Sequence, residues 1–367
     1  MVQLRRRWRL AVTRRKARNM QTLWFWLVSV MVAVYAVLDG YDFGVGLLHR
    51  YVARSDSERR EVLGAIGPFW DGNEVWLLAG GGALFVAFPR VLAAGFSGLY
   101  LAMFLVLWTL LLRGIAIEFR SHLSDGLWRS FWDSCFVFAS ALMPLFLGVA
   151  LGNIVRGVPL DPQGQFNLPL FTSFLPFGEV GILDLYTVTV GLLVWVTIAS
   201  HGALFLAWKT GGDVQARALG LVRPIWSINL VLAVVATAAT AKVSPTLYAA
   251  LPNSPIAWLG LVLYLGASPC VLLFHRRRQH LQAFLASSAF ILGILVATAA
   301  CAFPVMLRST IDPQYNLTAY NASAGATGLR IGAVWWFIGF PIAISYVFLL
   351  QYLHRGKAHS AKDGEGY

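Results

Sequence analysis

The residues best suited to chemistry in this sequence lie in a short polar segment, residues 68–76, at the mouth of a long apolar stretch. Asp71, Asn73 and Glu74 stand there together, and the fourteen residues that follow, 75–88, carry no charge. Acidic groups at the edge of a membrane span are costly unless they pair or serve a pathway for ions or protons. The segment therefore predicts either an ion-pair network or a proton route.

A second acidic pair comes earlier in the chain, where Asp39 and Asp42 stand three residues apart. On a helix this spacing puts both carboxylates on one face. Gly40 and Gly44 form a small-xxx-small pair, extended by Gly46, and such a pair allows a second helix to approach closely. We therefore expect Asp39 and Asp42 to lie at a tight helix crossing.

The composition identifies an integral membrane protein. Hydrophobic residues make up 58% of the 367 residues and charged residues only 13%, about half the share of a soluble domain. The net charge of +12 comes from Lys and Arg in short clusters between apolar spans, which is typical of membrane loops. Nucleic acid is therefore not an expected partner.

Runs of about 20 mostly apolar residues predict membrane-spanning helices. Such runs give an all-α fold of about nine spans, at residues 22–48, 70–88, 91–112, 131–152, 184–208, 222–242, 256–274, 281–305 and 332–353. Only a short turn separates the second run from the third. We expect a tight helical hairpin there, with Pro89 ending the first of its helices.

The basic residues predict how the chain crosses the membrane. Sixteen Lys and Arg lie on the side reached after odd-numbered spans, against five on the other side when residues 1–19 are left out. The positive-inside rule then puts the N-terminus outside and the C-terminus in the cytoplasm. Asp39, Asp42, Asp71 and Glu74 would gather near the cytoplasmic face, on the same side as Arg113, Glu118 and Arg120.

The predicted domain organisation has three parts: a basic leader at residues 1–19, one transmembrane domain at 20–355 and a cytoplasmic tail at 356–367. The leader holds eight Arg and Lys, on the side where the rule disfavours them. We therefore expect translation to begin at Met20. Two longer stretches outside the spans, 153–183 and 306–331, are poor in charge and are expected to be ordered surface loops or docking surfaces.

The polar groups have a structural interpretation beside the functional one. Charges at span ends pair with each other and cap helices, with Asp71 as an N-terminal cap, and this interpretation is favoured for Asp42, Glu118 and Arg120. Function is favoured for Asp39 and Asp71. We expect Trp70, Trp76 and the glycines at 80–82 to pack beside the acidic segment.

Histidine and cysteine indicate little metal or haem chemistry. His201 is the one histidine well inside a predicted span, and a hydrogen bond between helices is the favoured role for it. Cys135, Cys270 and Cys301 are isolated in apolar surroundings, so neither a metal site nor a disulfide framework is indicated. If the chain takes part in electron transfer, the cofactors are expected elsewhere.

Several segments together resemble subunit II of the cytochrome bd-type quinol oxidases. The similarity is dense through about residues 22–160, and the segments that carry it are residues 38–46, 68–76, 80–89, 96–100 and 113–120. The segment 113–120 and the element His201-Gly202-Ala203 are closer to the cyanide-insensitive branch of that family. Two features depart from it: the basic leader, and Glu74 in place of the glutamine of some members.

The resemblance implies two four-helix bundles plus one peripheral helix, paired with a haem-bearing subunit I as a heterodimer. Subunit I of the family holds the b-type haems and the d-type haem (or a b-type substitute), and the complex oxidises quinol and reduces dioxygen to water. This chain would bind no haem or metal itself, and small accessory subunits and membrane lipid are further partners.

The resemblance also implies roles for single residues. The family's tryptophan-aspartate-glycine-asparagine motif supplies a proton-path carboxylate, which maps onto Asp71. Trp70, Asp39 and Arg113 match positions near the subunit boundary. Two alternatives stay open: a proton-coupled secondary transporter that uses Asp39 and Asp71, and a purely structural assembly subunit whose carboxylates only pair.

Overall fold

The computed structural model describes residues 2–175 and 178–358, with side chains from residue 17 onward. Helices make up most of it, and the described residues contain eight helices long and apolar enough to cross a membrane, with one sharply bent helix pair as a ninth candidate. The all-α, multi-pass membrane fold is therefore confirmed.

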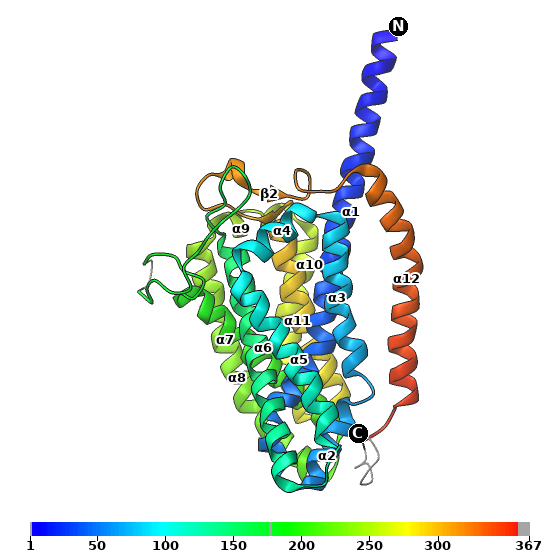
Figure 1. The fold of residues 1–367 in the computed structure, drawn as a ribbon, viewed down its shortest axis with the longest axis vertical. Coiled ribbons are helices and arrows are strands. Elements are labelled where there is room, and N and C mark those ends of the chain that lie inside the picture. Colours follow the sequence, from blue (N-terminus) through cyan, green and yellow to red (C-terminus); the bar gives the residue numbers. More distant parts are fainter. Residues whose placement is uncertain (1, 176–177, 359–367) are drawn as a thin grey trace.

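The spans form two groups of four and one peripheral helix (Figure 1). The first group consists of α1 (Val2–Val52), α3 (Trp70–Ala87), α5 (Tyr100–Arg120) and α6 (Gly126–Arg156). The second consists of α7 (Leu185–Lys209), α8 (Gly212–Val243), α10 (Pro255–Arg276) and α11 (His280–Ala302). Helices α1, α6 and α7 join the two groups, and α7 is the most buried span.

The ninth helix, α12 (Ala326–Leu353), stands apart on one side of the bundle (Figure 1). It packs mainly along α1 and α3 and buries the least of all the spans. Its start is held by Trp24, whose indole N–H donates to the Leu329 carbonyl at 2.9 Å. Its end is held by Lys209, whose ammonium donates to the His354 carbonyl at 2.8 Å. The peripheral helix is thus fixed at both ends.

The predicted tight hairpin after the second span is wrong. Helix α3 ends at Ala87, and Pro89 starts a separate helix, α4 (Pro89–Gly98), bent by 119° from α3. Proline ends α3 as expected, but its fixed φ also suits the first position of a new helix. Because α4 uses residues 89–98, the third span is α5 rather than residues 91–112.

A short helix, α2 (Asp56–Ile66), connects α1 to α3. Ser55 and Glu58 form a capping box at its start, in which the side chain of each residue accepts a hydrogen bond from the backbone N–H of the other. Two N–H groups at the helix start are thereby satisfied. The predicted spans include no element here, although the Ser-x-x-Glu spacing is a recognised signal for a helix start.

The two long loops pack together over α4, at the end of the bundle away from α2 (Figure 1). Val158 pairs with Ser309 across the two loops, and β1 (Val305–Leu307) pairs with β2 (Leu317–Thr318). Short helical turns complete this end of the molecule: α9 (Pro245–Ala249), η1 (Leu251–Asn253) and η2 (Pro313–Tyr315). The described residues of the loops share a small apolar core of their own, as expected of ordered loops.

Candidate functional site: a buried acidic cluster beside an open groove

A glycine crossing between α1 and α7 positions the first pair of acids. A Cβ on Gly44 would lie 2.1 Å from the Ile198 carbonyl oxygen, and one on Gly202 would lie 2.2 Å from the Gly44 backbone. Only hydrogen atoms fit between the two backbones there. The small residues therefore allow the close approach expected for Gly44, and they hold Asp39 and Asp42 inside the bundle.

Arg113 is the centre of the cluster. Its guanidinium pairs with Asp39 through Nη1 and with Glu74 through Nη2, the latter at 2.6 Å. The side chains of Arg113 and Asp39 have no exposed surface, and that of Glu74 is 24% exposed. Three helices, α1, α3 and α5, thus contribute one charge each. Arg113 lies inside α5 and not at its end, because α4 has shifted the third span along the sequence.

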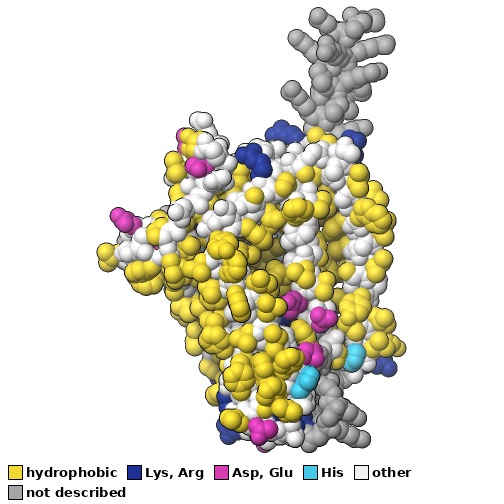
Figure 2. Space-filling model, in the orientation of Figure 1, with side chains coloured by type: hydrophobic (Ala, Val, Ile, Leu, Met, Phe, Trp, Pro, Cys, Tyr) yellow, Lys and Arg dark blue, Asp and Glu magenta, His cyan; other side chains and the backbone are white. Residues whose placement is uncertain are grey.

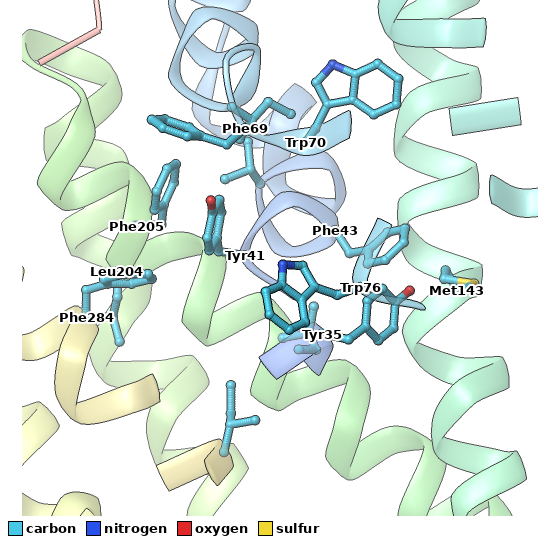
Figure 3. Close-up of a cluster of buried hydrophobic side chains, with 14 of the residues drawn as sticks. Tyr35, Tyr41, Phe43, Phe69, Trp70, Trp76, Met143, Leu204, Phe205 and Phe284 are labelled. Carbon is cyan, nitrogen blue, oxygen red and sulfur yellow. The ribbon is translucent and has the colours of Figure 1, made fainter. Parts of the chain in front are cut away.

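Aromatic rings surround this guanidinium. Its carbon lies 4.2 Å from the centre of the Phe43 ring and 5.7 Å from that of Trp70. Figure 3 shows Phe43 and Trp70 among the buried hydrophobic side chains of this part of the bundle. A cation over an aromatic face is attracted by the ring quadrupole, so both rings stabilise the charge of Arg113. Trp70 also packs over Gly114 on α5.

Asn73 connects Asp42 to the same cluster. Its side-chain amide donates to Asp42 Oδ2 and to the Tyr41 hydroxyl, both at 2.7 Å. Tyr41 in turn stacks on Phe205, with ring centres 4.1 Å apart (Figure 3). The structure therefore brings Asp39 and Glu74 together on Arg113, and Asn73 holds Asp42 beside them.

Asp71 lies outside this cluster. It is exposed on α3 and lines a groove of about 600 Å³ between α3 and α12. Tyr346 of α12 packs against Gly72 at the same end of the groove. The interpretation of Asp71 as an N-terminal cap is wrong, because Phe69 is the N-cap residue of α3 and no side chain caps it. Asp71 lies in the first turn of α3, where the positive end of the helix dipole stabilises its negative charge.

The rest of the groove is apolar and wide. Trp76 and Phe340 form its floor in edge-to-face contact, with ring centres 5.8 Å apart. Gly82 and Gly339 line it, and a Cβ on either would meet nothing within 4 Å. The expectation that the glycines at 80–82 pack beside the acids is therefore wrong for Gly81 and Gly82. Figure 2 shows acidic side chains on this otherwise hydrophobic face.

Glu118 does not join the cluster either. It is exposed on α5, and its backbone carbonyl lies 3.0 Å from the ring nitrogen Nδ1 of His122. Five residues separate it from Arg113, so the two side chains leave the helix on different faces.

A second buried cluster, which the sequence analysis missed, centres on Asp133 of α6. Its carboxylate accepts from Arg120 Nε at 2.6 Å, from His49 Nε2 at 2.8 Å and from Arg59 Nη1 at 3.0 Å. Asp133, His49 and Arg120 are all buried. The sequence contained a signal, a lone aspartate in an apolar run facing a histidine at another span end, but no spacing connects residues so far apart in the chain.

Asp56 extends the second cluster to α2. It pairs with Arg120 and Arg129, each at 2.8 Å, and with Arg60 at 3.2 Å. Partial burial raises the pKa of the Asp56 carboxyl, but the hydrogen bond and charge of Arg120, with Arg129 and Arg60, outweigh this and hold it below its ordinary value. The cluster therefore ties α2 to α1, α5 and α6.

His201 has the role favoured for it, a hydrogen bond between helices. Its Nε2 donates to the Val37 carbonyl at 3.0 Å, and its Nδ1 lies 2.7 Å from the Ser287 hydroxyl. The ring also stacks on Phe284, with ring centres 4.8 Å apart. Both nitrogens are engaged, so this residue does not fit a haem ligand. Among residues 2–175 and 178–358, no group of three or more His, Cys, Asp or Glu could hold a metal ion.

Comparisons with known proteins agree with this architecture. The family model for cytochrome bd terminal oxidase subunit II matches residues 20–354. The cytochrome bd ubiquinol oxidase subunit 2 of Bacillus subtilis is 32% identical over 345 residues, which cover 92% of this chain and 98% of that protein. The cytochrome bd-I ubiquinol oxidase subunit 2 of Escherichia coli is also 32% identical, over 84% of this chain and 87% of that protein.

The fold has a counterpart among solved structures. A chain of the bd oxidase from Geobacillus thermodenitrificans superposes with a TM-score of 0.74 and 18% identity, covering 92% of this chain and 99% of that one. This likeness concerns the arrangement of helices, whereas the family match and the relatives concern the sequence itself. The chain therefore belongs to the cytochrome bd terminal oxidase subunit II family.

Proposed function

We propose that this chain is the non-haem subunit II of a bd-type quinol oxidase. In this role it stabilises the haem-bearing subunit I and contributes a carboxylate route for the protons used in reducing dioxygen to water. Relatives named as ubiquinol oxidase subunits support the activity of the complex. The b-type haems and the d-type haem (or a b-type substitute) would belong to subunit I, and His201, with both ring nitrogens engaged, is not suited to bind one.

A gradient of exposure among four carboxylates supports the proton route. Asp71 is exposed, Glu74 is 24% exposed, and Asp39 and Asp42 are fully buried. Buried acids inside a membrane span are costly and typically mark a proton or ion pathway. Protons would enter at Asp71 and pass towards the cluster or across the groove to subunit I.

The groove between α3 and α12 suits the docking of subunit I. It is apolar, it lies along two spans, and Gly82 and Gly339 leave room for the side chains of another helix. Small residues at a membrane helix surface favour such close packing. With subunit I in place, Asp71 would lie at the boundary between the subunits, which explains why this acid faces away from its own bundle.

The proposed orientation puts the end of the bundle that holds α2 in the cytoplasm. Four arginines lie at this end: Arg50 in the last turn of α1, Arg54 in the linker that follows, and Arg59 and Arg60 in α2. A concentration of basic residues marks the cytoplasmic side. Asp71, in the first turn of α3, would then take up protons from the cytoplasm.

Replacing Asp71 with Asn in the complete complex tests this function. Asp213→Asn is a matched control, since Asp213 is also exposed in the first turn of a span. We expect Asp71→Asn to retain haem content and to lower oxygen consumption at least about tenfold, which corresponds to about 1.4 kcal/mol in the barrier. Asp71→Glu should recover much of the loss, and Asp213→Asn should consume oxygen at the wild-type rate.

Two results would contradict the proposal. Unimpaired oxygen consumption by Asp71→Asn would leave the carboxylates a structural role only. Purification of the chain without a haem-bearing partner would favour a transporter.

A further inference from the structure

Among the ionisable side chains of the buried cluster, Asp42 is the one without a partner of opposite charge. It is fully buried in α1, and its Oδ2 accepts one hydrogen bond, from the neutral amide of Asn73 at 2.7 Å. Its Oδ1 has no hydrogen-bond partner among the described residues. No Lys, Arg or His of the described chain forms an ion pair with it.

The surroundings of Asp42 offer no substitute for such a partner. The neighbouring Tyr41 stacks on Phe205 and meets Phe284 edge-on, with ring centres 4.1 and 5.8 Å apart. The nearest cation of the cluster, Arg113, is already shared between Asp39 and Glu74. An isolated carboxylate buried in such an apolar setting is far less stable than the neutral acid.

The charge balance of the cluster points the same way. The cluster holds three acids, Asp39, Asp42 and Glu74, and one base, Arg113, which pairs with Asp39 and Glu74. If all three acids were ionised, two negative charges would be uncompensated inside a membrane span, at a cost of several kcal/mol for each. Asp39 and Glu74 have the cation, so the acid that gains most from a proton is Asp42.

We propose that Asp42 carries a proton in the resting protein and serves as the inner proton store of the cluster. This inference rests on the proposed proton route, because Asp42 would be the buried end of that route and would hold a proton before transfer. Asp39 and Asp42 stand one helical turn apart, and each has a carboxylate oxygen without a hydrogen-bond partner. When the proton moves from Asp42 to Asp39, Asp42 becomes a carboxylate and Asp39 becomes the protonated acid, so the net charge of the pair is unchanged.

Infrared spectroscopy of the purified complex tests the store directly. A protonated carboxyl group shows a carbonyl stretch that is distinct from the bands of an ionised carboxylate and moves on exchange into heavy water. We expect Asp42→Asn to remove one such band. The control Asp213→Asn, which changes an exposed acid at the start of α8, should leave it in place.

Assembly provides a second, independent readout. If Asp42 is uncharged, the uncharged Asn can replace it and accept the same hydrogen bond from Asn73. The Asp42→Asn complex should then assemble and contain as much haem as the Asp213→Asn complex. An ionised Asp42 that balanced Arg113 would not tolerate the change. Persistence of the band in Asp42→Asn, or failure of this variant to assemble while Asp213→Asn does, would overturn the proposal.

Failure of this inference and failure of the proposed function give different results. The store is refuted if the infrared band persists in Asp42→Asn or if Asp42→Asn fails to assemble while Asp213→Asn does, whatever the oxygen consumption of the Asp71 variant. The proton route is refuted by normal oxygen consumption in Asp71→Asn, whatever the state of Asp42. If both hold, Asp42→Asn should also lower oxygen consumption at full haem content.

Discussion

Arg113 and Arg120 stand two turns apart on α5, and each belongs to a buried cluster, yet the two clusters are built differently. Around Arg120, the carboxylate of Asp133 receives hydrogen bonds from Arg120, Arg59 and His49, on both of its oxygens. Around Arg113, acids outnumber the base, and Asp39 and Asp42 each keep one oxygen without a hydrogen-bond partner.

This difference separates a structural role from a role in proton transfer better than burial does. A fully hydrogen-bonded carboxylate among cations gains nothing from a proton, so the Asp133 cluster is suited to holding α2 against the bundle. An acid-rich cluster with open acceptor oxygens gains from protons and can exchange them. The predictions below test this contrast.

The largest effect is expected for Asp133→Ala. Removing this carboxylate leaves Arg120 and Arg59 without the acid that they share, and breaking a buried ion pair costs about 3–5 kcal/mol. We expect loss of most of the assembled complex, measured as haem-containing protein per cell and as thermal stability. Ser134→Ala, a change at the exposed neighbouring position, is the control. Equal yields of the two variants would show that the cluster does not hold the fold together.

A smaller loss is expected in the acid-rich cluster. Asp39→Asn leaves Arg113 with Glu74 as its remaining carboxylate, and the loss of a charged hydrogen bond costs about 1.5–3 kcal/mol. Glu74→Gln should cost less, because the Glu74 side chain is 24% exposed and water can replace it. Thermal unfolding of both variants checks the order. A Glu74→Gln variant less stable than Asp39→Asn would reverse our assignment of the main partner of Arg113.

The glycine crossing gives the next effect. A methyl group at Gly44 would meet the backbone of α7, at the level where α1 carries Asp42. Forcing an extra carbon into a tight contact typically costs about 1–3 kcal/mol. We expect Gly44→Ala to lower thermal stability and oxygen consumption together. Gly220→Ala is the matched control, since a Cβ there meets nothing within 4 Å. Equal stability of the two variants would mean that the acid-rich cluster tolerates movement of α1.

The spans and the acid-rich cluster could be predicted from the sequence because both follow from local patterns. Long apolar runs dictate helices in a membrane. Asp39 and Asp42 stand three apart, as do Asp71 and Glu74, so each pair was expected on one helix face. In the structure, Asp39 and Glu74 share Arg113, and Asp42 is bound by Asn73, the neighbour of Glu74. Asp71 does not join them, since the packing of α3 against α12 decides which side of that face opens to the groove.

Other features depend on distant parts of the chain. The position of Arg113 inside α5 follows from the helix that starts at Pro89, and a proline gives no indication of whether the chain then turns back or starts a second helix. The pairing of His49 with Asp133 joins residues 84 positions apart. Only the packing of α1 against α6 brings these two together, so no local pattern reveals it.

The smallest effect is expected at Asp56, at the exposed edge of the Asp133 cluster, where a change of pH tests the contrast between the two clusters. The pKa of the Asp56 carboxyl is held below its ordinary value of about 4, although burial opposes this, because Arg120, Arg129 and Arg60 surround it. A lowered folded-state pKa gives stability that is present above the unfolded value and is lost as the pH falls through the folded value. The side chain is 37% exposed, so the effect should stay below about 1 kcal/mol.

We expect wild-type protein to lose its stability advantage over Asp56→Asn as the pH falls below about 4, measured as the difference in melting temperature. Arg129→Gln should reduce this difference in part, because Arg129 is one of three bases on Asp56. A difference that grows on acidification would have the wrong sign, and Asp56 would then not be an ionised member of the cluster.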